Sequence, residues 1–292
     1  MSRPAQQNRH LKGVLAIFLA GICFGTTGTS QSLLGKEISP LAIGSARLIV
    51  GAIALQLFAR FFSSRSKAPI ARKDLWLSAL GVAIYQLAFF SAVKTTGVST
   101  ATITALGSSP IFTGIIAFFL IKEKPIRAWF VATALTIIGI LLLNNGGTDI
   151  RFSFAGFILA LTASAGVSLM NVSARRALST GTELPIFMAK VFTRSAILIS
   201  PFLFAQNPEW IATAKGATLV IWLGVIATAL AYTLYATGLK HLAASTSATL
   251  LLAEPATATI LAVTVLGNTV APAGWVGIGF VLAGLIYLGA RS

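Results

Sequence analysis

The sequence predicts an all-α polytopic membrane protein in which ten transmembrane helices form two inverted repeats of five helices. Hydrophobic residues make up 56% of the 292-residue chain, charged residues make up 10%, and the mean hydropathy is +0.86. A soluble domain carries about a quarter charged residues, so this composition indicates a lipid environment. The placement of Lys and Arg supports the number of helices, and a set of recurring residues supports the repeats.

Ten apolar stretches are long enough to be transmembrane helices, which need roughly 20 apolar residues each. In chain order they are residues 13–35, 38–59, 75–93, 95–121, 128–148, 152–174, 184–206, 216–239, 242–267 and 270–290. The first follows the polar, basic residues 1–12. It is too long for the apolar core of a signal peptide and lacks an obvious cleavage site, so we interpret it as a span.

Few charges interrupt these stretches. The first five hold only Arg47, in the second stretch. The seventh holds Lys190 and Arg194, and the ninth holds Glu254. The last apolar run, residues 255–290, is too long for the remainder of one span, and the turn signal Gly267-Asn268-Thr269 divides it into the ninth and tenth spans.

Lys and Arg are concentrated in alternate loops, with 15 on one side of the predicted membrane, four on the other and three inside spans. The 15 are Arg3, Arg9, Lys12, Arg60, Arg65, Lys67, Arg72, Lys73, Lys122, Lys124, Arg127, Arg175, Arg176, Lys240 and Arg291. Cytoplasmic loops carry the excess of these residues, which predicts an inner-membrane protein with both termini in the cytoplasm. The same placement accounts for the net charge of +15 without a nucleic-acid partner.

No pattern for enzymatic chemistry emerges. Cys23 is the one cysteine, which excludes a disulfide framework within the chain and a zinc site built on several cysteines. His10 and His241 lie at membrane ends, and Asp74 and Asp149 lie at opposite faces of the predicted membrane. The sequence also contains no Gly-x-x-x-x-Gly-Lys-[Ser/Thr] motif. We therefore predict no catalytic residues, no metal and no cofactor.

Several residues recur at an interval of 145, which is close to half of the chain. The pairs are Pro40 and Pro185, Thr104 and Thr249, Leu106 and Leu251, Pro110 and Pro255, and Gly139 and Gly284. They predict one repeat over residues 1–148 and a second over residues 149–292. Because each repeat holds five spans, the second enters the membrane from the opposite side, as in many secondary transporters.

Prolines at matching positions indicate where a transported solute would bind. Ser108-Ser109-Pro110 in the fourth span corresponds to Ala253-Glu254-Pro255 in the ninth. Proline removes a backbone hydrogen bond, and interrupted helices in two halves point to a binding site. The alternative is an ordinary packing kink, which is common in membrane helices.

The charges inside spans are a second indication of a site. By helical rise, Glu254 lies about 18 Å and Arg194 about 15 Å into helices that run the same way. The matched depths permit an ion pair, which would either contact the solute or only stabilise packing. Arg47, about 13 Å from the outer side, is either a gate contact or a packing residue. Lys190 is shallow enough for its amine to reach the inner interface.

Aromatic pairs occur in equivalent spans of the two halves. Tyr85 and Phe89 share one helix face in the third span, and Tyr232 and Tyr235 share one in the eighth. These side chains are candidates for the wall of a cavity for an apolar or aromatic solute. The alternative is aromatic packing.

The sixth span carries small and polar residues at every fourth position, continuing from Gly156 through Ser164 and Ser168, with Asn171 nearby. Such a face usually indicates close helix packing. Ser164, Ser168 and Asn171 could also offer hydrogen bonds to a polar head group.

These features together resemble the drug/metabolite transporter superfamily in its EamA-type branch. The residues that carry the resemblance are Gly13-Val14-Leu15-Ala16, Cys23-Phe24-Gly25-Thr26, Ala46-Arg47-Leu48, Ser109-Pro110-Ile111-Phe112-Thr113, Lys122-Glu123-Lys124, Trp129, Gly139, Glu254-Pro255, Trp275-Val276-Gly277 and Gly284. One departure is Gly267-Asn268, where relatives commonly have Gly-Glu. The resemblance extends over the whole chain.

The resemblance implies a secondary exporter of small, largely apolar solutes, with amino acids, including aromatic ones, favoured. Its expected partners are the lipid bilayer and a small-molecule solute. An uncoupled facilitator, a multidrug or nucleotide-sugar-like transporter of the same fold, and more remotely a membrane enzyme are the alternatives. The sequence leaves open the substrate, the coupling ion and the oligomeric state.

Overall fold

The computed structural model describes residues 3–34, 38–63, 70–143, 153–205 and 208–291, and these residues form helices and connecting segments with no strand. The helices are α1 (Arg3–Leu34), α2 (Pro40–Phe62), α3 (Arg72–Thr96), α4 (Val98–Ile121), α5 (Arg127–Leu143), α6 (Phe154–Ser179), α7 (Leu184–Phe204), the 3-10 helix η1 (Pro208–Ala212), α8 (Ala214–Gly224), the π-helix η2 (Val225–Leu230), α9 (Ala231–His241), α10 (Ala244–Leu250), α11 (Ala253–Leu266) and α12 (Pro272–Arg291). The predicted span ends at residues 35, 144–148, 152 and 206, together with Arg65, Lys67 and Asp149, lie outside the described residues.

The all-helical membrane fold is confirmed. Within the described residues, nine helical stretches are long and apolar enough to cross a membrane, and α5 is a shorter apolar helix of 17 residues. One of the nine combines α8, η2 and α9, and another combines α10 and α11. The predicted turn between the last two spans is present, because Gly267 ends α11 with a positive φ of 69°.

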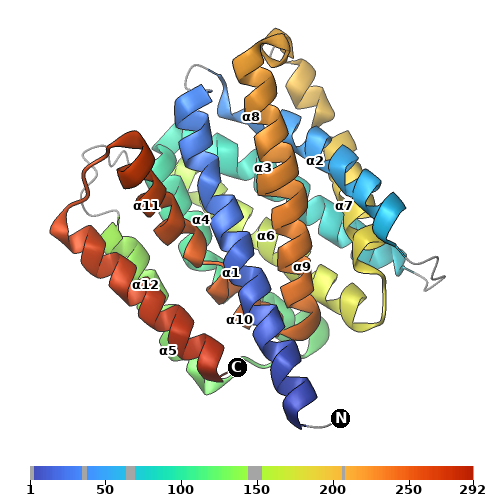
Figure 1. The fold of residues 1–292 in the computed structure, drawn as a ribbon, viewed down its shortest axis with the longest axis vertical. Coiled ribbons are helices and arrows are strands. Elements are labelled where there is room, and N and C mark those ends of the chain that lie inside the picture. The colour runs from blue at the N-terminus through green and yellow to red at the C-terminus, as the bar shows by residue number, and fades with distance from the viewer. Residues whose placement is uncertain (1–2, 35–37, 64–69, 144–152, 206–207, 292) are drawn as a thin grey trace.

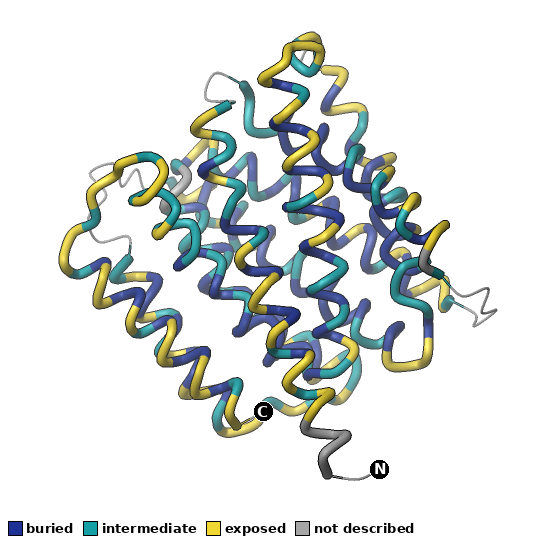
Figure 2. The backbone as a smooth tube through the Cα atoms, viewed as in Figure 1, coloured by how far each residue is buried: buried dark blue, intermediate teal, exposed yellow. Residues whose placement is uncertain are grey.

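The helix contacts of one half of the chain match those of the other half (Figure 1). The counterpart of a helix is the helix that forms the span of the same rank in the other half. Helix α6 packs against α3 and α4, and its counterpart α1 packs against α9 and α11. Helix α2 packs against its counterpart α7, and α5 packs against its counterpart α12. The two chain ends lie at the same end of the bundle in Figure 1. Figure 2 places the buried residues in the interior and the exposed ones on outward faces, where apolar side chains meet lipid.

Glycines allow two helix pairs to approach closely. A Cβ atom built on Gly277 of α12 would lie 2.6 Å from the carbonyl oxygen of Gly139 in α5, and the reverse contact is equally short. A Cβ atom on Gly81 of α3 would lie 2.6 Å from the carbonyl oxygen of Gly166 in α6. Small residues at these positions bring the backbones together, as is usual in membrane proteins.

Replacing Gly277 with alanine should destabilise the protein, because the added methyl group meets backbone atoms that cannot move aside. Overpacking of this kind costs roughly 1–3 kcal/mol. Gly279→Ala is the matched control on the same helix, since a Cβ atom there meets nothing within 4 Å. Thermal unfolding in detergent should show a lower midpoint for Gly277→Ala than for Gly279→Ala. Equal midpoints would contradict the close packing of α5 and α12.

The helix interruptions differ from the predicted pair. Helix α4 continues through Pro110, whereas the ninth span is divided between α10 and α11 just before Glu254. The eighth span, predicted over residues 216–239, contains the π-helical turns of η2. This segment packs against α2, where a Cβ atom on Gly51 would lie 2.5 Å from Thr228. Short π-helical segments are frequent at functional sites.

Candidate functional site

The break between α10 and α11 places Glu254 in the first turn of a helix that starts inside a span. Helix α10 ends at Leu250, and the Glu254 backbone N–H donates to the Leu251 carbonyl oxygen at 2.9 Å. Pro255 follows in the first turn, where its missing N–H costs no helical hydrogen bond. Glu254 is half-buried.

Arg47 of α2 and Gln86 of α3 form a buried polar pair. Arg47 Nη2 donates to Gln86 Oε1 at 3.1 Å, and its guanidinium carbon lies 5.9 Å from the centre of the Phe90 ring. Gly44 makes this possible, because a Cβ atom there would lie 2.4 Å from Gln86 Nε2 and 2.3 Å from Phe90. Arg47 is 7% exposed.

These groups converge from four helices. Glu254 lies close enough to Arg47 for their charges to interact, and both interact electrostatically with Tyr85 of α3 and Tyr232 of α9. Glu254 and Tyr85 are both half-buried. Gly107 of α4 is buried, and a Cβ atom built on it would meet nothing within 4 Å. Open space therefore lies beside α4 at this buried glycine.

The predicted pairing of Arg194 with Glu254 is wrong. Among the described residues, the ion pairs do not include either side chain. Arg194 instead lies 5.5 Å from the centre of the Trp76 ring and donates to the Lys190 carbonyl oxygen at 3.1 Å. Equal depth does not produce contact, because α7 packs against α2, α3 and α9, whereas α11 packs against α1, α5 and α12. Lys190 is exposed, as its shallow position predicts.

The two aromatic pairs have different surroundings. Tyr85 and Phe89 stack with ring centres 5.5 Å apart, and both keep accessible surface. Tyr232 is buried between Phe24 and Phe192, with ring centres 4.8 and 4.5 Å away. The third-span pair is therefore half-buried against alanines of α3, α4 and α6, while Tyr232 packs in the core. Tyr235 is 1% exposed and fully packed in the same core.

Two of the serines predicted for the site, Ser168 and Ser108, form hydrogen bonds within the protein. Ser168 of α6 accepts from Thr113 at 2.9 Å and donates to the Ser109 carbonyl oxygen at 3.1 Å, which ties α6 to α4. Ser108 donates to the Thr104 carbonyl oxygen within α4 at 2.5 Å.

Two other predicted polar residues are buried without such pairing. Within the described part of the chain, the Ser164 hydroxyl and both amide atoms of Asn171 have no hydrogen-bond partner, although both residues are 0% exposed. Buried polar groups are usually paired, so α6 carries polar groups that its packing alone does not satisfy.

A polar network at one end of the bundle was not predicted. Glu123 accepts from the Ala244 backbone N–H at 2.7 Å and lies 3.6 Å from Arg175. Arg175 donates to the carbonyl oxygens of Leu239 and Lys240 at 2.9 and 3.1 Å. The loop after α4, the end of α9 and the start of α10 are thus joined through α6.

A second ion pair lies at the same end. Arg176 Nε donates to Asp74 Oδ1 at 2.6 Å, and the Asp74 side chain is 6% exposed. This pair joins the start of α3 to the end of α6. We refer to Asp74, Glu123, Arg175 and Arg176 together as the end network.

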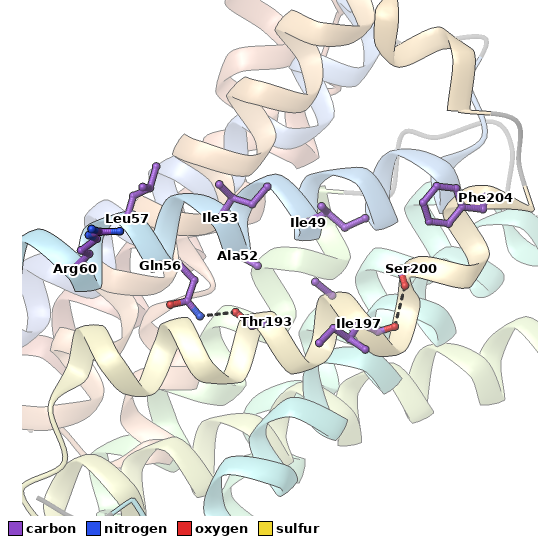
Figure 3. A pocket seen from close by; sticks show the side chains of 11 residues that line it. Ile49, Ala52, Ile53, Gln56, Leu57, Arg60, Thr193, Ile197, Ser200 and Phe204 are labelled. Carbon is purple, nitrogen blue, oxygen red and sulfur yellow. Dashed lines mark hydrogen bonds between the residues drawn. The ribbon is translucent and has the colours of Figure 1, made fainter. Parts of the chain in front are cut away.

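A groove of about 610 Å³ runs between α2 and α7 (Figure 3). Isoleucines including Ile53 and Ile197 line it, and Gln56 donates to Thr193 across it at 2.8 Å. None of the predicted site residues lines this groove. It is therefore separate from the residues around Glu254.

The comparisons with known proteins agree on a family and a fold. The sequence model of the EamA-like transporter family matches residues 11–145 and again residues 154–290. The chain is 36% identical over 276 residues to a Bacillus subtilis protein named Uncharacterized transporter YwfM, covering 94% of this chain and 93% of that protein. It is 22% identical over 292 residues to the Uncharacterized inner membrane transporter YicL of Salmonella typhimurium, covering 96% of each. A solved crystal structure superposes with a TM-score of 0.80 and 18% identity over 94% of this chain and 95% of that chain, which shows a shared fold.

Proposed function

We propose, from the premise that this chain belongs to the EamA-like transporter family, that it is a secondary exporter of small, largely apolar solutes and that amino acids are its substrates. Family membership establishes a multi-pass membrane transporter rather than an enzyme. The substrate class, the direction and the mechanism are the proposed part.

The observation that carries the substrate proposal is the chemistry at mid-bundle. Tyr85 and Phe89 form a half-buried stacked aromatic pair, and Arg47 and Glu254 are charges of opposite sign that interact with Tyr85. Small-molecule sites typically combine an apolar wall with a few polar groups that orient the ligand. A zwitterion with a bulky apolar side chain matches this combination better than a sugar or a phosphate does.

We infer that transport proceeds by alternating access between two inverted repeats, residues 1–148 and 149–292. The exchange symmetry of the helix packing and the double match to the family model support this division. The end network closes one end of the bundle in this conformation. Movement of one repeat against the other would release the end network, open this end of the bundle and close the other end.

The distribution of Lys and Arg supports a cytoplasmic position for the end network and for both termini. Cysteine labelling of intact cells tests this orientation in a Cys23→Ser background. An impermeant maleimide should label Asn268→Cys, in the exposed turn after α11, and should not label Thr180→Cys, after α6. The reverse pattern would overturn the orientation.

Uptake into proteoliposomes tests the substrate class. We expect unlabelled phenylalanine, leucine and threonine to compete with radiolabelled phenylalanine, and nucleosides, nucleotide sugars and cationic drugs to compete poorly. Saturable uptake of a nucleotide sugar or a drug, with no competition by amino acids, would favour the multidrug or metabolite alternative.

A further inference from the structure

Two unpaired hydrogen-bond donors lie beside each other on α2 and α3. The bond from Arg47 Nη2 to Gln86 Oε1 leaves Arg47 Nε and Gln86 Nε2 without partners among the described residues. Arg47 is 7% exposed and Gln86 is 1% exposed. Buried donors are almost always paired, so these two are unusual, and an acceptor brought by a solute would satisfy them. A guanidinium beside an amide N–H matches a carboxylate best.

The opposite charge comes from α11. Glu254 interacts electrostatically with Arg47, but its carboxylate forms no ion pair with any residue in the described ranges. It keeps accessible surface inside the bundle. A half-buried carboxylate without an ion-pair partner among the described residues is suited to bind an ammonium group.

The apolar contribution comes from the neighbours of Gln86 on α3. Tyr85 precedes it directly, and Phe89 stacks on Tyr85 at 5.5 Å. Tyr85 also interacts with both Glu254 and Arg47. The acceptor for an ammonium group, the donors for a carboxylate and the aromatic surface therefore belong to one site.

We propose that this site recognises both charges of an α-amino acid: Arg47 and Gln86 bind its carboxylate, Glu254 binds its ammonium group, and Tyr85 and Phe89 contact its side chain. The inference rests on the proposed function and adds the groups that determine specificity. The alternative is a purely structural role, in which Arg47 and Glu254 only neutralise each other's charge. In that case, a variant of either residue would weaken binding of every solute equally, whichever charged groups the solute carries.

The test pairs each side-chain change with removal of one group from phenylalanine. The probes are phenylalanine, 2-phenylethylamine, which lacks the carboxylate, and 3-phenylpropionate, which lacks the ammonium group. Competition with radiolabelled phenylalanine on purified protein gives the affinities. In the unaltered protein, each analogue should bind about tenfold or more weakly than phenylalanine, because each loses a charge-assisted hydrogen bond.

The variants should lose affinity selectively. Glu254→Gln should weaken the binding of phenylalanine about tenfold and the binding of 3-phenylpropionate far less. Arg47→Gln should weaken the binding of phenylalanine and leave the binding of 2-phenylethylamine unchanged. Gln86→Leu should act in the same direction as Arg47→Gln, which supplies a second variant if Arg47→Gln does not fold. Thr259→Ala is the control on α11, since that hydroxyl bonds its own helix at Pro255.

Two failures are distinguishable. If the unaltered protein neither binds nor transports any amino acid, the proposed function fails. If it transports phenylalanine but each variant weakens the binding of all three probes by the same factor, the proposed recognition of the two charged groups is overturned. Arg47 and Glu254 then have a structural role.

Discussion

Replacing Arg176 with methionine should destabilise the folded protein by roughly 3–5 kcal/mol, the cost typical of leaving a buried charge without its partner. The residue left behind is Asp74, whose side chain is 6% exposed. Thermal unfolding in detergent should show this as a large fall in midpoint. The double variant Asp74→Asn with Arg176→Met should be more stable than Arg176→Met alone, because no unpaired carboxylate then remains.

Arg72→Met is the matched control, because Arg72 is exposed and lies two residues before Asp74. Its midpoint should stay close to that of the unaltered protein. If Arg72→Met and Arg176→Met lower the midpoint equally, the ion pair between α3 and α6 contributes nothing specific.

We expect removal of Glu123 to open the end of the bundle that, in our proposal, the end network closes. Glu123→Ala deletes the bond to the Ala244 N–H and the interaction with Arg175, and bonds to charged groups contribute about 1.5–3 kcal/mol. The readout is a cysteine at Ser247 of α10, which is 0% exposed, in a Cys23→Ser background. Labelling by a membrane-permeant maleimide should accelerate about tenfold or more in Glu123→Ala, because each 1.4 kcal/mol shifts the closed-to-open ratio tenfold.

Lys124→Ala provides the control, since Lys124 is exposed in the same loop. It should leave the labelling rate of the Ser247→Cys reporter unchanged. A rate that is equal in Glu123→Ala and Lys124→Ala would show that the end network does not hold this end closed.

Hydropathy and charge placement were sufficient to predict the spans. Every helix in lipid must be apolar along its length and must leave most of its charges in the flanking loops. They also identified Arg47 and Glu254 as charges inside spans. They failed for Arg194, because helical rise gives the depth of a residue and not the neighbours of its helix. Gln86 was missed because one polar residue in a span of ordinary hydropathy gives no periodic signal.

The two prolines show a further limit. Ser108 and Ala253 occupy equivalent positions two residues before Pro110 and Pro255. The Ser108 hydroxyl bonds the Thr104 carbonyl within a continuous α4, whereas Ala253 has no hydroxyl and begins a new helix. Proline alone therefore did not predict which span would break. The π-helix η2 contains neither proline nor glycine, so no local signal marked it.

The end network could not be predicted either, because it joins side chains to backbone groups far apart in the chain. Lys122-Glu123-Lys124 indicated only a charged loop. The contact with Ala244 depends on how the fourth and ninth spans pack.

The most direct test of a carrier that alternates between two faces is counterflow of phenylalanine. Proteoliposomes are loaded with a high concentration of unlabelled phenylalanine and diluted into a trace of labelled phenylalanine. The account predicts a transient accumulation of label above its equilibrium level, which requires a saturable site exposed to one side at a time. Entry of label that only approaches equilibrium, at a rate independent of the internal phenylalanine, would contradict it.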